Sequence, residues 1–405
     1  MILEEEHRRE AKLVGKMQKA HSRPIVHLQF VYNGSQVALC TVGHDTIKLW
    51  SLSDLQGDDM VVFTPTCSFG DFRCGVQSAH CLADGSCTGV LGVESVIYSL
   101  EADHEGVPLV RCHDMGYMES WHIRCLSAGH FITTSFSGYL SEVIDGKFEK
   151  RQAYTKMKSV TAVALSPSCQ LFAMSYPEGS VELVDVSTLK SIQTFEAHYM
   201  RMRVLLFLSD SYLLTGSDDK TVRYFPIKTT PKVEHTYCGH RGPITSIAPH
   251  PNTQLYRNFA SGSSNGQIIL WNIDTREVLV NMVGIHEGTV SGLAFSLCGQ
   301  YLVSGAEDKT LIVHRVAPAP YEEGLPLLTT GIIGEEEEKE NELPNDEDNQ
   351  WNEDNEHNET FAVDTRNLFG DDSSDEEADK ENEDTMNRQE WNGDGGEGWR
   401  NEEDE

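Results

Sequence analysis

The sequence predicts an all-β fold, and three observations lead to this prediction. Between residues 20 and 316 the chain consists of short apolar or alternating runs, each bounded by Gly, Pro, Ser, Asn or Asp, a pattern typical of strands and turns. A similar unit recurs about every 40 to 45 residues, the period of a four-stranded propeller blade. The last unit also lacks one strand, and a strand-like run near the N-terminus resembles the missing one.

Three repeats near the end of this region carry the clearest signature. Each opens with a histidine, continues through a Ser- or Gly-rich strand and a polar turn, and closes in a β-branched strand that ends at a ring. Their opening residues are His198, His240 and His286, which stand 42 and 46 residues apart. A fourth copy opens at His21 and closes at Trp50. We number these units as blades 5, 6, 7 and 1 of a propeller.

Three weaker units fill the interval between blades 1 and 5. They keep the strand pattern but lose the signature residues, and we place them at about 76–100, 121–144 and 160–186. The last of the three is the clearest, because its closing strand at 181–186 follows the pattern of the other copies. The sequence therefore predicts a seven-bladed β-propeller.

Closure of the ring is a separate prediction. Blade 7 ends after three strands, at Val316. The run 12–17 stands before His21 as the run 278–282 stands before His286, so we expect it to supply the fourth strand of blade 7. Pairing the two ends in this way leaves only short strand edges exposed.

The composition changes sharply after the last strand, beginning with Ala317-Pro318-Ala319-Pro320. We divide the chain into a lead-in (1–11), a propeller (12–316), a linker (317–334) and an acidic tail (335–405). The tail holds 30 of the 64 acidic residues and 5 of the 32 basic ones. With so few apolar residues it cannot offset the entropy of ordering, so we expect it to be disordered.

Charge and hydropathy exclude several classes of protein. Since the tail holds most of the formal net charge of −32, the rest of the chain is only mildly acidic, and we expect no direct binding of nucleic acid. No run approaches the roughly 18 apolar residues of a membrane helix, and the N-terminus lacks the features of a signal peptide. We expect a soluble protein made in the cytosol, with its ten cysteines reduced.

The sequence also predicts no enzymatic activity. The chain has no G-x-x-x-x-G-K-[ST] phosphate loop and no G-x-S-x-G elbow, and its 16 histidines show no H-E-x-x-H or other tight metal spacing. Acidic pairs such as Asp218-Asp219 lie in predicted turns. We therefore expect no catalysis, no metal and no cofactor.

The repeats resemble the WD-repeat family over roughly residues 12–316. Blades of that family often carry a hydrogen-bonded tetrad of His, Ser or Thr, Asp and Trp, but no blade of this sequence shows a complete set and the Trp-Asp dipeptide is absent. Asn265 stands where Asp is expected, and Phe225 cannot donate as an indole N–H would. The resemblance implies a structural role for His198, Ser217 and Asp219 in blade 5, His240, Ser263, Asn265 and Trp271 in blade 6, and His286 and Asp308 in blade 7.

The resemblance also implies a docking face, lined by the loops that run from the outer strand of one blade to the inner strand of the next. In blade 5 this loop mixes an aromatic ring, thioethers and cations, a composition enriched at interfaces. In the alternative interpretation, Met202 packs inside and the arginines are solvated. The residues that we expect on this face are Tyr199, Met200, Arg201, Arg203, Arg241 and Glu307.

Within the WD-repeat family, the sequence looks most like the superkiller-type subunit shared by the superkiller RNA-decay complex and the polymerase-associated factor elongation complex. The resemblance rests mainly on Gln18-Lys19-Ala20-His21, on residues 197–203 and on 213–219. It implies a non-catalytic scaffold or adaptor, with a monomeric propeller that binds protein partners in a larger complex.

Two other functions stay open. The chain could be an acidic-tailed chaperone for basic clients such as histones or ribosomal proteins, whose charge the tail would screen. It could also be the substrate receptor of a ubiquitin ligase. In the tail, Ser373 and Ser374 each precede an acidic residue three positions on, which suits phosphorylation by an acidophilic kinase.

Overall fold

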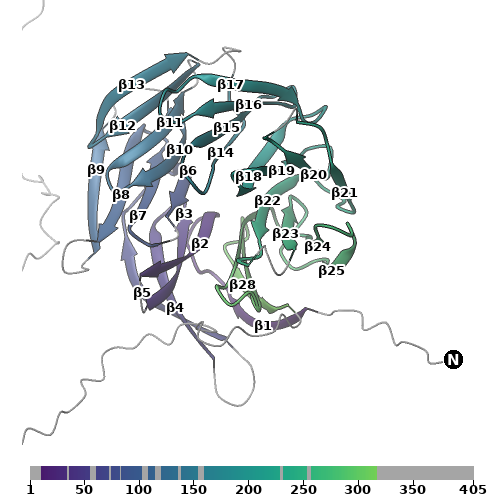
Figure 1. The fold of residues 1–405 in the computed structure, drawn as a ribbon. Coiled ribbons are helices and arrows are strands. Elements are labelled where there is room, and N and C mark those ends of the chain that lie inside the picture. Colours follow the sequence, from purple (N-terminus) through teal and green to yellow (C-terminus); the bar gives the residue numbers. More distant parts are fainter. Residues whose placement is uncertain are drawn as a thin grey trace, which may run out of the picture. The chain divides into compact units, whose positions relative to one another are not determined.

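A computed structural model describes residues 11–316 with short gaps, and in this part of the chain every regular element is a β-strand. The strands form seven four-stranded antiparallel sheets, arranged as blades around a centre (Figure 1), so the seven-bladed propeller is confirmed. Residues 1–10 and 317–405, with Ser373 and Ser374, lie outside the described residues. The gaps fall at 34–35, 55–60, 73, 83, 103–107, 115–119, 136–137, 154–158, 229–230 and 253–256.

Blades 1 to 4 each use four consecutive strands, ordered from the inside outward. Blade 1 holds β2 (Ile25–Asn33), β3 (Gln36–Gly43), β4 (Ile47–Asp54) and β5 (Val61–Phe69). Blade 2 holds β6 (Val76–Cys81), β7 (Cys87–Gly92), β8 (Val96–Ala102) and β9 (Pro108–Asp114). Blade 3 holds β10 (Ser120–Ser127), β11 (His130–Ser135), β12 (Tyr139–Ile144) and β13 (Lys147–Ala153). Blade 4 holds β14 (Ala162–Leu165), β15 (Leu171–Ser175), β16 (Ser180–Asp185) and β17 (Ser191–Glu196).

Blades 5 and 6 repeat this order, whereas blade 7 takes one strand from the other end of the chain. Blade 5 holds β18 (Met202–Ser209), β19 (Tyr212–Ser217), β20 (Thr221–Pro226) and β21 (His235–Cys238). Blade 6 holds β22 (Ile244–Pro249), β23 (Asn258–Ser263), β24 (Ile268–Asn272) and β25 (Val278–Met282). Blade 7 holds β26 (Val290–Phe295), β27 (Tyr301–Ala306), β28 (Leu311–Arg315) and β1 (Lys12–Met17).

The ring closes through β1, as the sequence predicted. Strand β1 pairs antiparallel with β28, from Lys12 opposite Arg315 to Met17 opposite Leu311, and the two strands lie side by side in Figure 1. Val14 of β1 is 1% exposed and packs in a cluster with residues of blades 1 and 7. The last blade therefore has no free outer edge on β28.

The core lies between neighbouring blades. Because each blade packs against a neighbour on both faces, its middle strands are buried on both sides, as the wholly buried β7 and β27 show. The outer strands differ, since β13 is exposed at every residue and β17 at most of them. These exposed, polar outer strands explain why the predicted units of blades 2, 3 and 4 stopped one strand too early.

Candidate functional site

On the face predicted for docking, a buried histidine forms a hydrogen-bonded network in each of blades 1, 5, 6 and 7. In blade 1 this network is a complete tetrad. The His21 ring lies 2.7 Å from Asp45 Oδ1 through Nδ1 and 2.8 Å from Thr41 Oγ1 through Nε2. Trp50 donates its indole N–H to the same hydroxyl at 2.8 Å. Burial by itself would raise the pKa of Asp45, but hydrogen bonds from His21 and Ser22 outweigh it and hold that pKa below its usual range. The expectation that no blade is complete was therefore wrong.

In blade 5, two of the three predicted tetrad residues contact each other, and Thr215 takes the place predicted for Ser217. His198 contacts Asp219 Oδ2 at 2.7 Å and Thr215 Oγ1 at 2.7 Å. Ser217 instead donates to the backbone carbonyl oxygens of Met200 (3.3 Å) and Arg201 (3.0 Å). Thr215 and Ser217 are two residues apart on β19, so both point to the same face of the sheet, and spacing alone could not choose between them.

Blade 6 shows the same shift of two residues. His240 Nε2 lies 2.6 Å from Ser261 Oγ, and the Trp271 indole N–H donates to that hydroxyl at 2.7 Å, so Ser261 rather than Ser263 belongs to the tetrad. Ser263 donates to Asn265 Oδ1 within its own turn. The Nδ1 atom of His240 is buried with no hydrogen-bond partner among the described residues, so Asn265 does not replace Asp in this contact.

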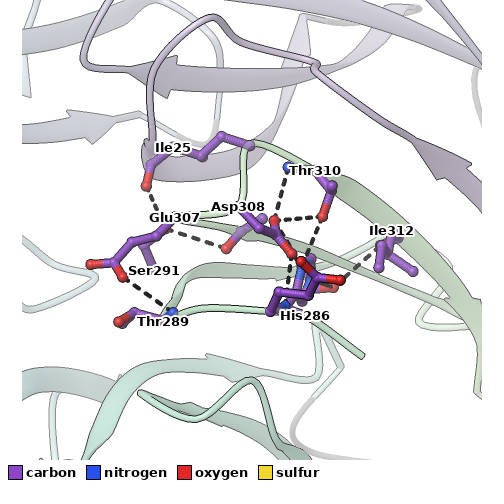
Figure 2. Close-up of polar contacts among 11 residues, drawn as sticks. Ile25, His286, Thr289, Ser291, Glu307, Asp308, Thr310 and Ile312 are labelled. Atoms are coloured by element: carbon purple, nitrogen blue, oxygen red, sulfur yellow. Dashed lines mark hydrogen bonds and ion pairs between the residues drawn. The ribbon is translucent and has the colours of Figure 1, made fainter. Parts of the chain in front are cut away.

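In blade 7 the predicted pair comes together (Figure 2). His286 Nδ1 lies 3.1 Å from Asp308 Oδ2 and 2.9 Å from Thr310 Oγ1, and its Nε2 lies 2.8 Å from Ser304 Oγ. His314 stands at the position that Trp holds in blades 1 and 6. These networks fix the loops before the inner strands against the turns between the second and third strands.

We call residues 197–203, which lead into blade 5, the docking loop. Its backbone is held by hydrogen bonds, and the side chains at its tip are exposed to solvent. Besides the two bonds from Ser217, the Asp218 amide donates to the Arg201 carbonyl oxygen at 2.9 Å. Tyr199 is 89% exposed and Met200 50% exposed. The Arg223 guanidinium carbon lies 5.6 Å from the centre of the Tyr199 ring, within range of a cation–π contact.

The remaining residues predicted for this face are all exposed, and the side chains of two of them, Arg203 and Glu307, make polar contacts within the protein. Met202 is fully buried, so that thioether packs in the core, whereas Arg201 and Arg203 are exposed and Arg203 forms an ion pair with Asp218. Arg241 is exposed in the corresponding loop of blade 6. Glu307 is also exposed and accepts the Thr289 amide at 3.3 Å (Figure 2).

Sequence reasoning missed a cavity at the centre of the ring. The innermost strands surround a cavity of ≈ 480 Å³ whose lining includes His27, His80 and Arg124. A lone basic residue on an inner strand has no periodic signature, so no pattern in the sequence could mark it. No group of three or more His, Cys, Asp or Glu side chains in the described ranges is placed to hold a metal ion. None of the described residues forms a helix that could cross a membrane.

Comparison with known proteins identifies the repeats. Residues 189–225, 231–272 and 278–315 match the family described as "WD domain, G-beta repeat". Each matched segment takes in the outer strand of one blade and the three inner strands of the next. The repeat in the sequence is thus offset by one strand from the blade, which is why the first strand of the chain completes the last blade.

Curated relatives are distant. The guanine nucleotide-binding protein subunit beta-1 of Nicotiana tabacum is 26% identical over 262 residues, which cover 61% of this chain and 67% of that protein. The pre-mRNA-processing factor 19 of Mus musculus is 34% identical over 97 residues, or 24% of this chain and 18% of that protein. These relatives give no support to the superkiller-type resemblance.

A solved structure matches the fold. The WD40 β-propeller domain of Doa1 superimposes with a TM-score of 0.58 at 18% identity, over 76% of this chain and 97% of that domain. At this level of identity the match describes the fold alone.

Proposed function

We propose that this seven-bladed propeller, three of whose repeats match the WD domain, is a non-catalytic scaffold that binds a protein partner through the docking loop of blade 5. One observation carries this proposal: Tyr199 is 89% exposed on a loop whose backbone is held in place. An aromatic side chain normally loses solvent contact in a folded chain, and one left exposed beside Met200 and Arg201 offers the residue types from which interface hot spots are drawn.

Rigidity supports the same proposal. Association costs free energy whenever loops and side chains must be ordered. Here the carbonyl oxygens of Met200 and Arg201 are already held by Ser217, and Arg203 is already paired with Asp218. A partner would therefore meet a preformed surface, and little of the binding free energy would be lost to ordering.

Co-purification tests the proposal. The whole chain and a Tyr199→Ala variant are expressed at equal levels, and the proteins recovered with each are quantified by mass spectrometry. A matched control is Ile192→Ala, which removes a side chain that is 56% exposed on the outer strand β17. Selective loss of a partner from the Tyr199 variant supports the proposal, and equal recovery from all three proteins contradicts it.

We further propose that the chain is a subunit of a larger complex that acts in RNA decay or transcription elongation, in the nucleus and cytoplasm. This finer proposal rests only on the superkiller-type resemblance of residues 18–21 and 197–203. The partners recovered in the same experiment decide it, because subunits of those complexes would have to be among the proteins that Tyr199→Ala loses.

A second candidate function rests on the charge of the tail. Since residues 335–405 concentrate so much negative charge, the chain could screen basic clients before their assembly, as proposed for an acidic chaperone. This function would depend on the tail and be sensitive to salt, whereas docking at Tyr199 would not require the tail.

A further inference from the structure

The centre of the propeller is chemically distinct from its docking face. The cavity of ≈ 480 Å³ is lined by residues from the innermost strand of every blade, which surround the centre in Figure 1. Most of these residues are apolar or carry hydroxyl groups. Among those described, Arg124 of β10 is the one permanently charged side chain, and no carboxylate lines the cavity.

Arg124 is a half-buried cation without an acidic partner among the described residues. Its guanidinium donates to the carbonyl oxygens of Ile123 (2.8 Å) and Val163 (2.5 Å). A guanidinium has five N–H donors, so these bonds leave donor capacity unused. Burial lowers the pKa of Arg124 to about 10, and the group stays protonated at neutral pH. A cation that is partly withdrawn from water and has no counter-charge favours an anionic ligand from outside the described chain.

Two histidines line the same cavity and add hydrogen-bonding groups. His80 Nδ1 accepts the backbone N–H of Cys125 at 3.2 Å, so the neutral ring carries its proton on Nε2. His27 Nε2 is buried with no partner among the described residues. Burial lowers the pKa of both rings, to about 4 for His27, and the charge on Arg124 lowers it further, so both rings are neutral at pH 7.

We propose that the central cavity binds a small oxyanion of the phosphate class at the Arg124 guanidinium, with His80 as a neighbouring hydrogen-bond donor. The planar guanidinium fork matches the paired oxygens of a tetrahedral oxyanion. No lining carboxylate repels such a ligand, and a neutral histidine can present an N–H to it. The lining includes apolar residues such as Leu28 and Phe207, which lower the local dielectric and so strengthen the contact.

Calorimetry on the whole chain tests this proposal, with inorganic phosphate as the probe in a buffer free of other oxyanions. The wild type is expected to bind phosphate saturably at a single site. Arg124→Gln should weaken that binding at least about tenfold, because a charge-assisted hydrogen-bonded contact is lost. The control is Arg111→Gln, which removes an arginine that pairs with Glu101 on the outer strands of blade 2. It should bind phosphate like the wild type.

Two further measurements keep the test decisive. Acetate in place of phosphate separates the phosphate class from a carboxylate ligand, since a site for carboxylates would bind acetate at least as well. If Arg124→Gln does not fold, the ring resonances of His27 and His80 in the wild type provide the answer. They should shift saturably with phosphate. Linear shifts without saturation, or equal phosphate affinity in the wild type and a folded Arg124→Gln, would overturn the proposal.

This site is separate from the docking loop. Tyr199→Ala should leave phosphate affinity unchanged, because Tyr199 lies in a loop and does not line the cavity. The two proposals can therefore fail independently.

Discussion

The hydroxyl of Ser217 donates a hydrogen bond of 3.0 Å to the backbone carbonyl oxygen of Arg201, and so ties the second strand of blade 5 to the docking loop. The same O–H is shared, as a bifurcated bond, with the neighbouring carbonyl oxygen of Met200 at 3.3 Å. Ser217 is fully buried, whereas the loop residues that it supports are exposed. A buried serine thus holds the exposed loop in place.

Ser217→Ala should therefore weaken partner binding, although Ser217 is buried and would not contact the partner itself. The Met200 carbonyl oxygen loses this donor and the Arg201 carbonyl oxygen keeps only the Asp218 amide, so we expect a loss of about 1 kcal/mol in the free energy of unfolding. Partner affinity should fall about threefold to tenfold, because the loop must then be ordered on binding. The matched control is Ser263→Ala at the same position of blade 6, where the hydroxyl bonds within its own turn. The control should lose similar stability and no affinity. Equal affinity of both variants would mean that the loop does not need this support.

Closure of the ring can be tested by two adjacent substitutions in β1. Val14 is 1% exposed between blades 1 and 7, and Leu13 beside it is 50% exposed. Val14→Asp should destabilise the protein by about 3 kcal/mol or more, because an unpaired carboxylate would be buried. Leu13→Asp should change the free energy of unfolding by about 0.5 kcal/mol or less. Chemical denaturation and limited proteolysis measure both, and similar values for the two variants would show that β1 does not seal the ring.

The contact between His198 and Asp219 in blade 5 predicts a pH dependence of stability. Burial would raise the pKa of Asp219, but hydrogen bonds from His198 and Thr221 outweigh it and lower that pKa from 3.8 to about 2. A depressed carboxyl pKa stabilises the fold above the unfolded value, and this contribution is lost as the pH falls from about 4 to about 2. Asp219→Asn should thus cost about 1 to 2 kcal/mol at pH 7, after solvent screening is allowed for, and less near pH 2. Denaturation curves at both pH values check this. A difference that does not shrink in acid would contradict the assignment.

Removal of residues 335–405 should leave the propeller intact. That segment is too poor in apolar residues to contribute a core, so we expect the melting temperature to change by less than about 4 °C. The same truncation should abolish binding to basic proteins at low salt if the chain is an acidic chaperone. A larger drop in melting temperature would show that the tail supports the fold, and undiminished binding would eliminate the chaperone function.

The fold was predictable because its signal is repeated and periodic. The opening histidines, the strand alternation and the resemblance of residues 12–17 to an outer strand all follow from local sequence. The outer strands β9, β13 and β17 escaped prediction, since a largely exposed strand carries a weaker apolar pattern than a buried one.

The site was less predictable, for two physical reasons. The pleat repeats every two residues, so Thr215 and Ser217 are equivalent in sequence and only the assembled blade shows which one meets His198. Arg124 and His27 come from strands far apart in the sequence, and they line one cavity only when all seven blades close.

The affinity of the purified chain for its main partner tests the scaffold function most directly. The variant Tyr199→Ala, Arg201→Glu removes the exposed ring and reverses the neighbouring charge, while the buried residues of blade 5 stay unchanged. We expect this variant to melt within a few degrees of the wild type and to bind the partner at least about thirtyfold more weakly, the loss typical of a hot spot. A well-folded variant that binds the partner as tightly as the wild type does would place docking elsewhere on the propeller.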